Sequence, residues 1–130
     1  MARFETLPLY GITYRFLIDV YQFTAKMPRE YKFSLGQKLQ EDTLKLFTHI
    51  YHANIVTNKT EYFNSFLEAF ELIRIQMRMC HDLRIMTIRQ QAHFIQAMEE
   101  IGRQVGAWKK YHLSKVKKDG VDEAGGGAVL

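Results

Sequence analysis

The stretch Phe63-Asn-Ser-Phe-Leu-Glu-Ala-Phe-Glu-Leu-Ile-Arg-Ile-Gln-Met-Arg-Met-Cys80 decides the fold. Its large apolar residues recur at alternating spacings of three and four, the periodicity of one buried face on a long α-helix. The members of this seam are Phe63, Phe66, Phe70, Ile73, Met77 and Cys80. Because the spacing is close to a heptad, it predicts a helix that packs lengthwise against other helices.

Three further segments show helical periodicity. Residues 7–26 and 34–56 are predicted helices, and a further helix is expected from residue 87 to about 113 or 116. The helix that contains the seam is expected to run from about residue 58 to 86. Long helices joined by short loops favour an all-α fold, an antiparallel up-down-up-down four-helix bundle. We assign residues 1–119 to this bundle. Residues 120–130 include three consecutive glycines and are predicted to form a flexible tail.

Three of the predicted helices begin at a capping box, in which a polar side chain and a Glu or Gln three residues later satisfy the first backbone N–H groups. The pairs are Ser34 with Gln37, Asn58 with Glu61, and Thr87 with Gln90. The first predicted helix stops at Met27-Pro28, since the residue before proline avoids the helical region.

The first helix carries more apolar residues than one core face needs. Its expected core stripe is Leu7, Tyr10, Tyr14, Leu17, Ile18, Tyr21 and Ala25. A second set, Ile12, Phe16, Val20 and Phe23, lies on another face, and Tyr62, Leu67, Leu72 and Ile75 lie off the seam of the third helix. Because one bundle buries one stripe per helix, this surplus predicts self-association.

Positive charge is concentrated in the second half of the 130-residue chain. The net charge is +4, but the segment from Arg74 to Lys118 alone has ten Lys and Arg against three acids. Such a field suits nucleic acid, an anionic membrane or an acidic partner. No apolar run reaches the length of a membrane span. The single cysteine, in an apolar run, and the lack of a signal peptide predict a buried thiol and a cytoplasmic protein.

The basic residues are the strongest candidates for a binding site. Arg74 and Arg78 are one helical turn apart, and a second series has no acid between its members: Arg103, Lys109, Lys110, Lys115, Lys117 and Lys118. Like charges gathered in this way repel one another unless a polyanion neutralises them, which favours contact with nucleic-acid phosphates. Phosphate contacts carry affinity and little sequence choice. The alternative is a structural bundle whose basic end only aids solubility and complements the helix dipole.

Sequence patterns of catalysis are weak. The chain has no Gly-rich phosphate loop, no Glu-x-x-His pair and no pair of polymerase aspartates, and His49 with His52 make at best a poor metal site. We therefore predict no metal, no cofactor and no enzyme. One alternative stays open: Arg74 and His81 resemble the Arg-x(4–6)-His motif of HEPN-type ribonucleases, although Ile75 stands where those enzymes usually have a polar residue.

Three stretches resemble one family of bacterial four-helix bundles. They are Met27-Pro-Arg-Glu-Tyr-Lys-Phe-Ser-Leu-Gly-Gln-Lys-Leu39, Ile73-Arg-Ile-Gln-Met-Arg-Met-Cys-His-Asp-Leu83 and Glu100-Ile-Gly-Arg-Gln-Val-Gly-Ala-Trp108. The family includes proteins encoded in intervening sequences of 23S ribosomal RNA genes. It also includes Avd, the accessory variability determinant of diversity-generating retroelements. The Gly-Arg-x-x-Gly-x-Trp pattern, which precedes a basic tail, favours the Avd branch.

The resemblance implies a homopentameric barrel of bundles that binds nucleic acid and a retroelement reverse transcriptase. It implies support for mutagenic cDNA synthesis from a template-repeat RNA, without polymerase activity of its own. The residues it assigns to nucleic-acid binding are Arg74, Arg78, Arg103 and the Lys109–Lys118 cluster. Gly102 and Gly106 are expected to permit close helix approach near Trp108.

Overall fold

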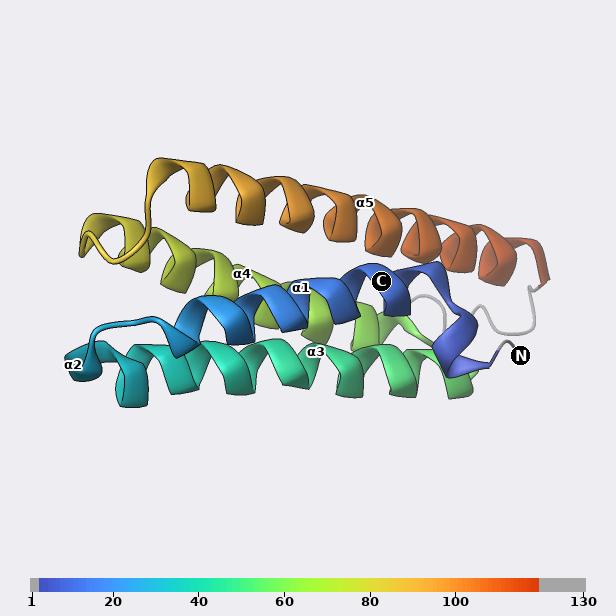
Figure 1. Cartoon of the computed structure of the whole chain (residues 1–130). Coiled ribbons are helices and arrows are strands. Elements are labelled where there is room, and N and C mark those ends of the chain that lie inside the picture. Colours follow the sequence, from blue (N-terminus) through green and yellow to red (C-terminus); the bar gives the residue numbers. More distant parts are fainter. Residues whose placement is uncertain (1–2, 120–130) are drawn as a thin grey trace.

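The structure is a computed structural model that describes residues 3–119, and the side chains of residues 3–117 (Figure 1). Helices make up nearly all of this part of the chain, and it contains no strand. The elements are η1 (Phe4–Thr6), α1 (Pro8–Ala25), α2 (Arg29–Tyr31), η2 (Lys32–Gly36), α3 (Gln37–Ile55), α4 (Thr60–Asp82) and α5 (Ile88–Asp119). The predicted all-α fold with four long helices is confirmed. The tail predicted for residues 120–130 lies outside the described residues.

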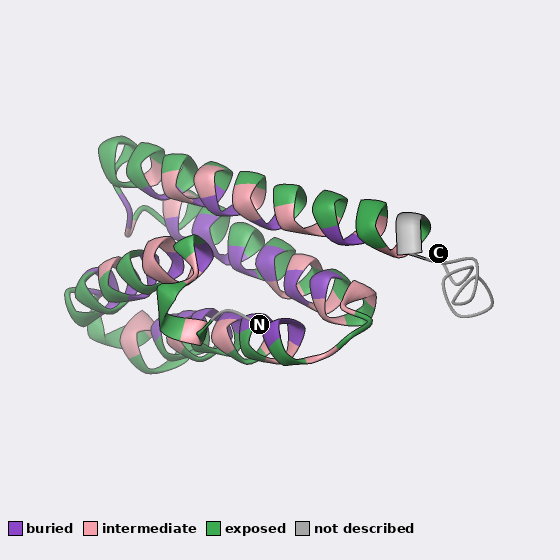
Figure 2. Ribbon diagram, turned by 90° about the vertical axis from the view of Figure 1, so that its right-hand side faces the viewer, coloured by how far each residue is buried: buried purple, intermediate pink, exposed green. Residues whose placement is uncertain are grey.

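The four long helices pack side by side, and each reverses the direction of the one before it (Figure 1). α1 contacts α3 and α5, and α4 also contacts α3 and α5, so the helices surround one core. Phe16, Leu39, Ile73 and Ile101, one from each long helix, are almost completely buried there. Figure 2 shows this buried edge along each helix and an exposed outer face.

The predicted core stripe of α1 is wrong for most of its members. Tyr14, Ile18 and Tyr21 are exposed, whereas Phe16 and Val20, from the second apolar set, are buried. The buried face of α1 is Leu9, Thr13, Phe16, Leu17, Val20, Phe23 and Thr24. Tyrosine hydroxyls keep their hydrogen bonds with water when the ring lies at the surface, whereas phenylalanine has no polar atom to satisfy. The surplus apolar surface of α1 is therefore its tyrosine face.

Two of the three predicted capping boxes differ from the prediction. Helical structure already begins at Arg29, directly after Pro28, and the Ser34 hydroxyl donates to the carbonyl of Tyr31 at 3.3 Å inside the π-helical turn. Asn58 Oδ1 accepts from the N–H of Thr60 at 3.2 Å, without a return bond from Glu61 among the described hydrogen bonds. Ser34 fails as a cap because the chain has no break there.

The third capping box is confirmed. Thr87 N–H donates to Gln90 Oε1 at 2.9 Å, and Gln90 N–H donates to Thr87 Oγ1 at 3.1 Å. Just before it, Arg84 has a positive φ of 63°, the conformation in which a glycine usually ends a helix. Arg84 N–H donates to the His81 carbonyl and Ile85 N–H to the Cys80 carbonyl, so α4 ends in a Schellman motif. A stop and a start signal are thus adjacent between α4 and α5.

Close helix approach occurs at Gly36, in contrast to the expectation for Gly102 and Gly106. A Cβ at Gly36 would lie 2.9 Å from the sulfur of Met27, whereas at Gly106 it would meet nothing within 4 Å. At Gly102 the nearest atom would be a ring carbon of Phe70, at an ordinary 3.9 Å. The tight approach is therefore where α1 meets the π-helical turn, where a side chain would displace Met27, and not near Trp108.

A buried polar pair joins α3 to α4. Gln76 Nε2 donates to Asp42 Oδ2 at 2.7 Å, and Lys38 Nζ donates to Asp42 Oδ1 at 2.8 Å. Asp42 and Gln76 are both more than nine-tenths buried, so the carboxylate depends on these two donors. Gln76 lies between Arg74 and Arg78 in the sequence, and its bond to Asp42 joins this part of α4 to α3.

Candidate nucleic-acid interface

The C-terminal half of α5 carries the predicted lysines at one end of the bundle. Lys110, Lys115 and Lys117 are exposed, and Lys109 is half-buried with its Nζ 3.2 Å from Asn64 Oδ1 of α4. We call these four residues the lysine end. None of the ion pairs within residues 3–117 involves one of them. The backbone of Lys118 continues α5, but its side chain lies outside the described residues.

Aromatic contacts hold this end of α5 against the bundle. The Trp108 ring packs edge-on against Phe63 of α4 with centroids 5.0 Å apart. His112, which is almost completely buried, contacts the same phenylalanine ring and accepts at Nε2 from the backbone N–H of Lys59 at 3.2 Å. Figure 2 shows the last turns of α5 reaching past the start of α4. These contacts therefore hold the part of α5 that carries the lysine end against the bundle, while much of its surface is exposed to solvent.

Lys59 is a functional candidate that the sequence reading missed. Its Nζ donates to the carbonyls of Ala53 at 2.5 Å and Val56 at 2.8 Å, and it lies 5.8 Å from the Trp108 ring centroid. Burial, and secondarily the positive charge of Lys115, lower the pKa of Lys59. Lys59 thus caps the end of α3 and adds a positive charge beside the lysine end. Its position just after a helix C-terminus, where cations are favoured, was the available sequence signal.

The predicted arginines have carboxylate partners. Arg74 Nε lies 3.3 Å from Glu71 Oε1, Arg78 Nε lies 3.7 Å from Asp82 Oδ2, and Arg103 pairs with Glu100. Each pair spans one helical turn, so the acids lie beside the arginines and not between them. The absence of acids between the basic residues in the sequence therefore does not leave these arginines unpaired. All three pairs are at the surface, where ion pairs are weak and partners exchange.

One chain does not bring all the predicted residues together. The contact between Lys109 and Asn64 shows which turns of the antiparallel helices α4 and α5 lie next to each other. Arg74 is ten residues further along α4, and therefore about 15 Å from that contact along the helix axis. Lys110, Lys115 and Lys117 extend in the opposite direction. The arginines of α4 and the lysine end are two separate groups within the chain.

The residues of the ribonuclease alternative lie two turns apart on α4. His81 Nδ1 lies 3.6 Å from Asp82 Oδ1, and Arg74 pairs with Glu71, so each residue has its own carboxylate neighbour. No hydrogen bond or ion pair among the described residues joins Arg74 to His81. This alternative stays a prediction.

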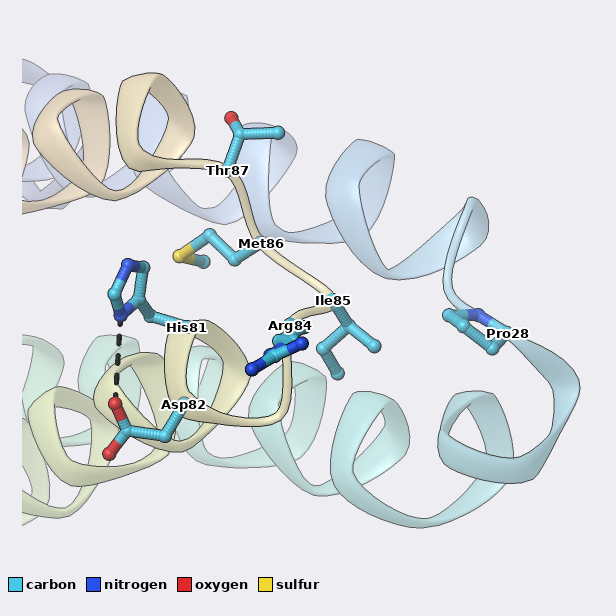
Figure 3. Close-up of a pocket in the computed structure, with 7 residues that line it drawn as sticks. All are labelled: Pro28, His81, Asp82, Arg84, Ile85, Met86 and Thr87. Carbon is cyan, nitrogen blue, oxygen red and sulfur yellow. Dashed lines mark ion pairs between the residues drawn. The ribbon is translucent and has the colours of Figure 1, made fainter.

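His81 also lines an open hollow of about 740 Å³ at the end of the bundle opposite the lysine end. Figure 3 shows its lining residues: Pro28, His81, Asp82, Arg84, Ile85, Met86 and Thr87. The dashed contact in that view is the ion pair between His81 and Asp82, which points along the surface of α4. The hollow is formed mainly by the turn between α4 and α5.

The remaining candidate residues, His49, His52 and Cys80, take part in the packing of the bundle. The His52 ring stacks on Tyr62 with centroids 5.2 Å apart, and burial lowers the pKa of His49. Within the described residues, no group of three or more His, Cys, Asp or Glu is placed to hold a metal ion. Cys80 is completely buried, as predicted, and burial raises its pKa to about 11. None of the described helices is long and apolar enough to cross a membrane.

Fold and charge define a class: small antiparallel four-helix bundles with a cationic surface at one end. A family model described as bAvd-like matches residues 11–112, from the first turn of α1 to the buried His112 of α5. The chain belongs to this bAvd-like family, in agreement with the resemblance to Avd. No curated protein and no solved structure matched the chain.

The family match suggests an accessory role in diversity-generating retroelements. The matched region includes Arg74, Arg78, Arg103, Lys109 and Lys110. It ends before Lys115, Lys117 and Lys118, so the role of those three lysines is argued from their charge and exposure.

Proposed function

We propose that the protein is a non-catalytic, nucleic-acid-binding accessory subunit that partners a retroelement reverse transcriptase in mutagenic cDNA synthesis, the retrohoming step. The observation that carries the proposal is the lysine end, four cations on one fixed helix in a bAvd-like chain. Exposed ammonium groups without carboxylate partners can each neutralise a phosphate. The paired, exposed arginines of α4 are a second, weaker contribution, since a polyanion must displace Glu71 and Asp82.

Salt-dependent binding tests the nucleic-acid part of this proposal. We expect the triple variant K110A/K115A/K117A to bind RNA or DNA more weakly, and to lower the slope of log affinity against log salt by about two for a single strand and about three for a duplex. A matched variant, K26A/R29A, removes exposed cations from the opposite end of the bundle and should change the slope by less than one. Equal slopes in the wild type and the triple variant would show that the lysine end makes no phosphate contacts.

Self-association, with a homopentameric ring as the expected form, is also part of the proposal. Its support is an exposed apolar face on α4, where Leu72 and Ile75 are each 55% exposed and Met79 and Leu83 more than 40%. Their spacing of three and four residues forms a continuous stripe on the outer face of the helix. An apolar stripe of this length is typical of a surface that another chain covers. Arg78 is one turn from Ile75, so an assembly that covers the stripe would bring Arg78 residues of several chains closer together.

The mass of the assembly in solution tests this second part. We expect Ile75→Glu to shift light-scattering mass toward a smaller species, while Ile75→Leu keeps the wild-type mass. Gln22→Glu adds the same charge at an exposed site on α1 and serves as the control. A wild-type protein that is monomeric at all concentrations would contradict the ring.

The reverse-transcriptase partner and the absence of catalysis need their own measurements. The proposal predicts that the purified protein and a reverse transcriptase of a diversity-generating retroelement elute together at low salt. It also predicts that RNA stays intact during long incubation without metal ions. RNA cleavage that disappears in His81→Ala would instead favour the ribonuclease alternative.

A further inference from the structure

Tyr111 is an aromatic residue that the bundle does not use. Its side chain is 64% exposed, although it lies only three residues after Trp108, which packs against Phe63. None of the ring contacts between described residues includes Tyr111. The ring face of Tyr111 is therefore open to solvent, and the residues around it indicate which kind of ligand could cover it.

One lysine neighbours this ring on the helix surface, and two more lie further around the helix. Lys115 is one turn away on the same face as Tyr111, and the exposed residues Lys110, Ser114 and Lys117 line the adjacent face. The helix that carries them is anchored by the bond between Lys59 and His112. A flat aromatic surface flanked by ammonium groups is therefore presented at a fixed position.

We propose that Tyr111 is a base-stacking platform and that the lysine end consequently prefers single-stranded nucleic acid to duplex. This inference rests on the proposed nucleic-acid function and specifies its ligand. Lysine contacts to phosphates do not depend on whether the bases are paired. Stacking does depend on base pairing. The faces of paired bases are covered by their neighbours in the duplex, whereas an unpaired base can stack on a tyrosine ring.

Binding to two forms of one sequence tests the proposal. The test measures, by fluorescence anisotropy, the affinity of the full chain for a single-stranded oligonucleotide and for its duplex. Tyr111→Ala is expected to weaken single-strand binding by about 5- to 100-fold, to leave duplex binding within about twofold and to keep the salt slope unchanged. Tyr111→Phe keeps the ring and should bind as the wild type does. Tyr21→Ala removes an exposed tyrosine on α1 and is the control.

A positional measurement complements the affinities. Ultraviolet crosslinking of a thiouridine-containing single strand, followed by mass spectrometry, is expected to label the peptide that contains Tyr111. Circular dichroism of each variant verifies that helix content is unchanged, which is expected because Tyr111 is exposed.

Three outcomes would overturn the inference, and they separate it from the proposed function. If Tyr111→Ala binds single strands normally while K110A/K115A/K117A does not, stacking is wrong and the phosphate contacts stand. If Tyr111→Ala weakens single-strand and duplex binding equally, the ring has no role in strand preference. If the wild type binds neither form at low salt, the proposed function itself fails.

Discussion

The backbone N–H of Lys59 donates to His112 Nε2 at 3.2 Å, across 53 residues of sequence. This bond joins the loop before α4 to the last turns of α5. The same lysine caps the end of α3 through the carbonyls of Ala53 and Val56. Lys59, just before α4, therefore bonds to the end of α3 and to α5, close to the lysine end.

His112→Phe should destabilise the protein. Phenylalanine keeps the ring but cannot accept the Lys59 N–H, and loss of such a bond at a buried site costs about 1–3 kcal/mol. Urea unfolding measures the change. The control is Gln96→Phe, which places the same ring at an exposed site of the same helix and should change stability by about 0.5 kcal/mol or less. Equal losses in both variants would mean that the bond to Lys59 contributes nothing.

Alanine at two glycines should have opposite effects. At Gly36 a Cβ would lie 2.9 Å from the buried sulfur of Met27, so Gly36→Ala should cost about 1–3 kcal/mol. Gly106 is an exposed helical residue with open space around it, and Gly106→Ala should stabilise by about 0.5–1 kcal/mol. Thermal unfolding compares the two. A shift in the same direction for both would contradict the close contact at Gly36.

Arg84→Gly should stabilise the turn between α4 and α5. Arg84 has φ 63°, a left-handed conformation that costs a non-glycine residue about 1–2 kcal/mol. Glycine adopts it without that strain, although its greater freedom in the unfolded chain offsets part of the gain. Arg84→Ala removes the same side chain but keeps Cβ, and should give no gain in the unfolding midpoint. A stabilised alanine variant would attribute the effect to charge.

Stability should fall as the pH falls below the ordinary histidine pKa of 6.5. Burial, followed by the charges of His52 and Lys45, lowers the pKa of His49 in the folded state. The unfolded chain then binds a proton at a higher pH than the folded chain does, so protonation favours unfolding. His49→Gln should lose less stability than the wild type between about pH 7.5 and about pH 5.5. Thr48→Gln, at an exposed neighbouring site, should behave as the wild type.

Helix number and most helix ends could be predicted because they depend on local patterns. The seam of α4 and the Thr87 cap need only residues three or four apart. The buried face of α1 could not be predicted as easily, since two apolar stripes compete and only the neighbouring helices choose between them. Ser34 misled because a π-helical turn keeps the chain helical where a cap was expected.

The candidate site was predictable in composition and not in geometry. Lys110, Lys115 and Lys117 are exposed, but the sequence does not show that Arg74, Arg78 and Arg103 pair with acids one turn away. Lys59 could not be assigned, because its link to His112 depends on how α4 and α5 align across the whole bundle. Sequence patterns describe residues that are close in the sequence, whereas this site depends on contacts between residues that are far apart in it.

The adjacent stop and start signals between Cys80 and Gln90 bear on how the chain reaches its native state. They reverse the direction of the chain within a few residues, so α4 can meet α5 after closing only a short loop. Contacts between segments that are close in sequence form rapidly, so we expect this hairpin to form early in folding, as a measurement of its protection from hydrogen exchange during refolding would test. The helices that precede it would then dock on a pair whose alignment is already set.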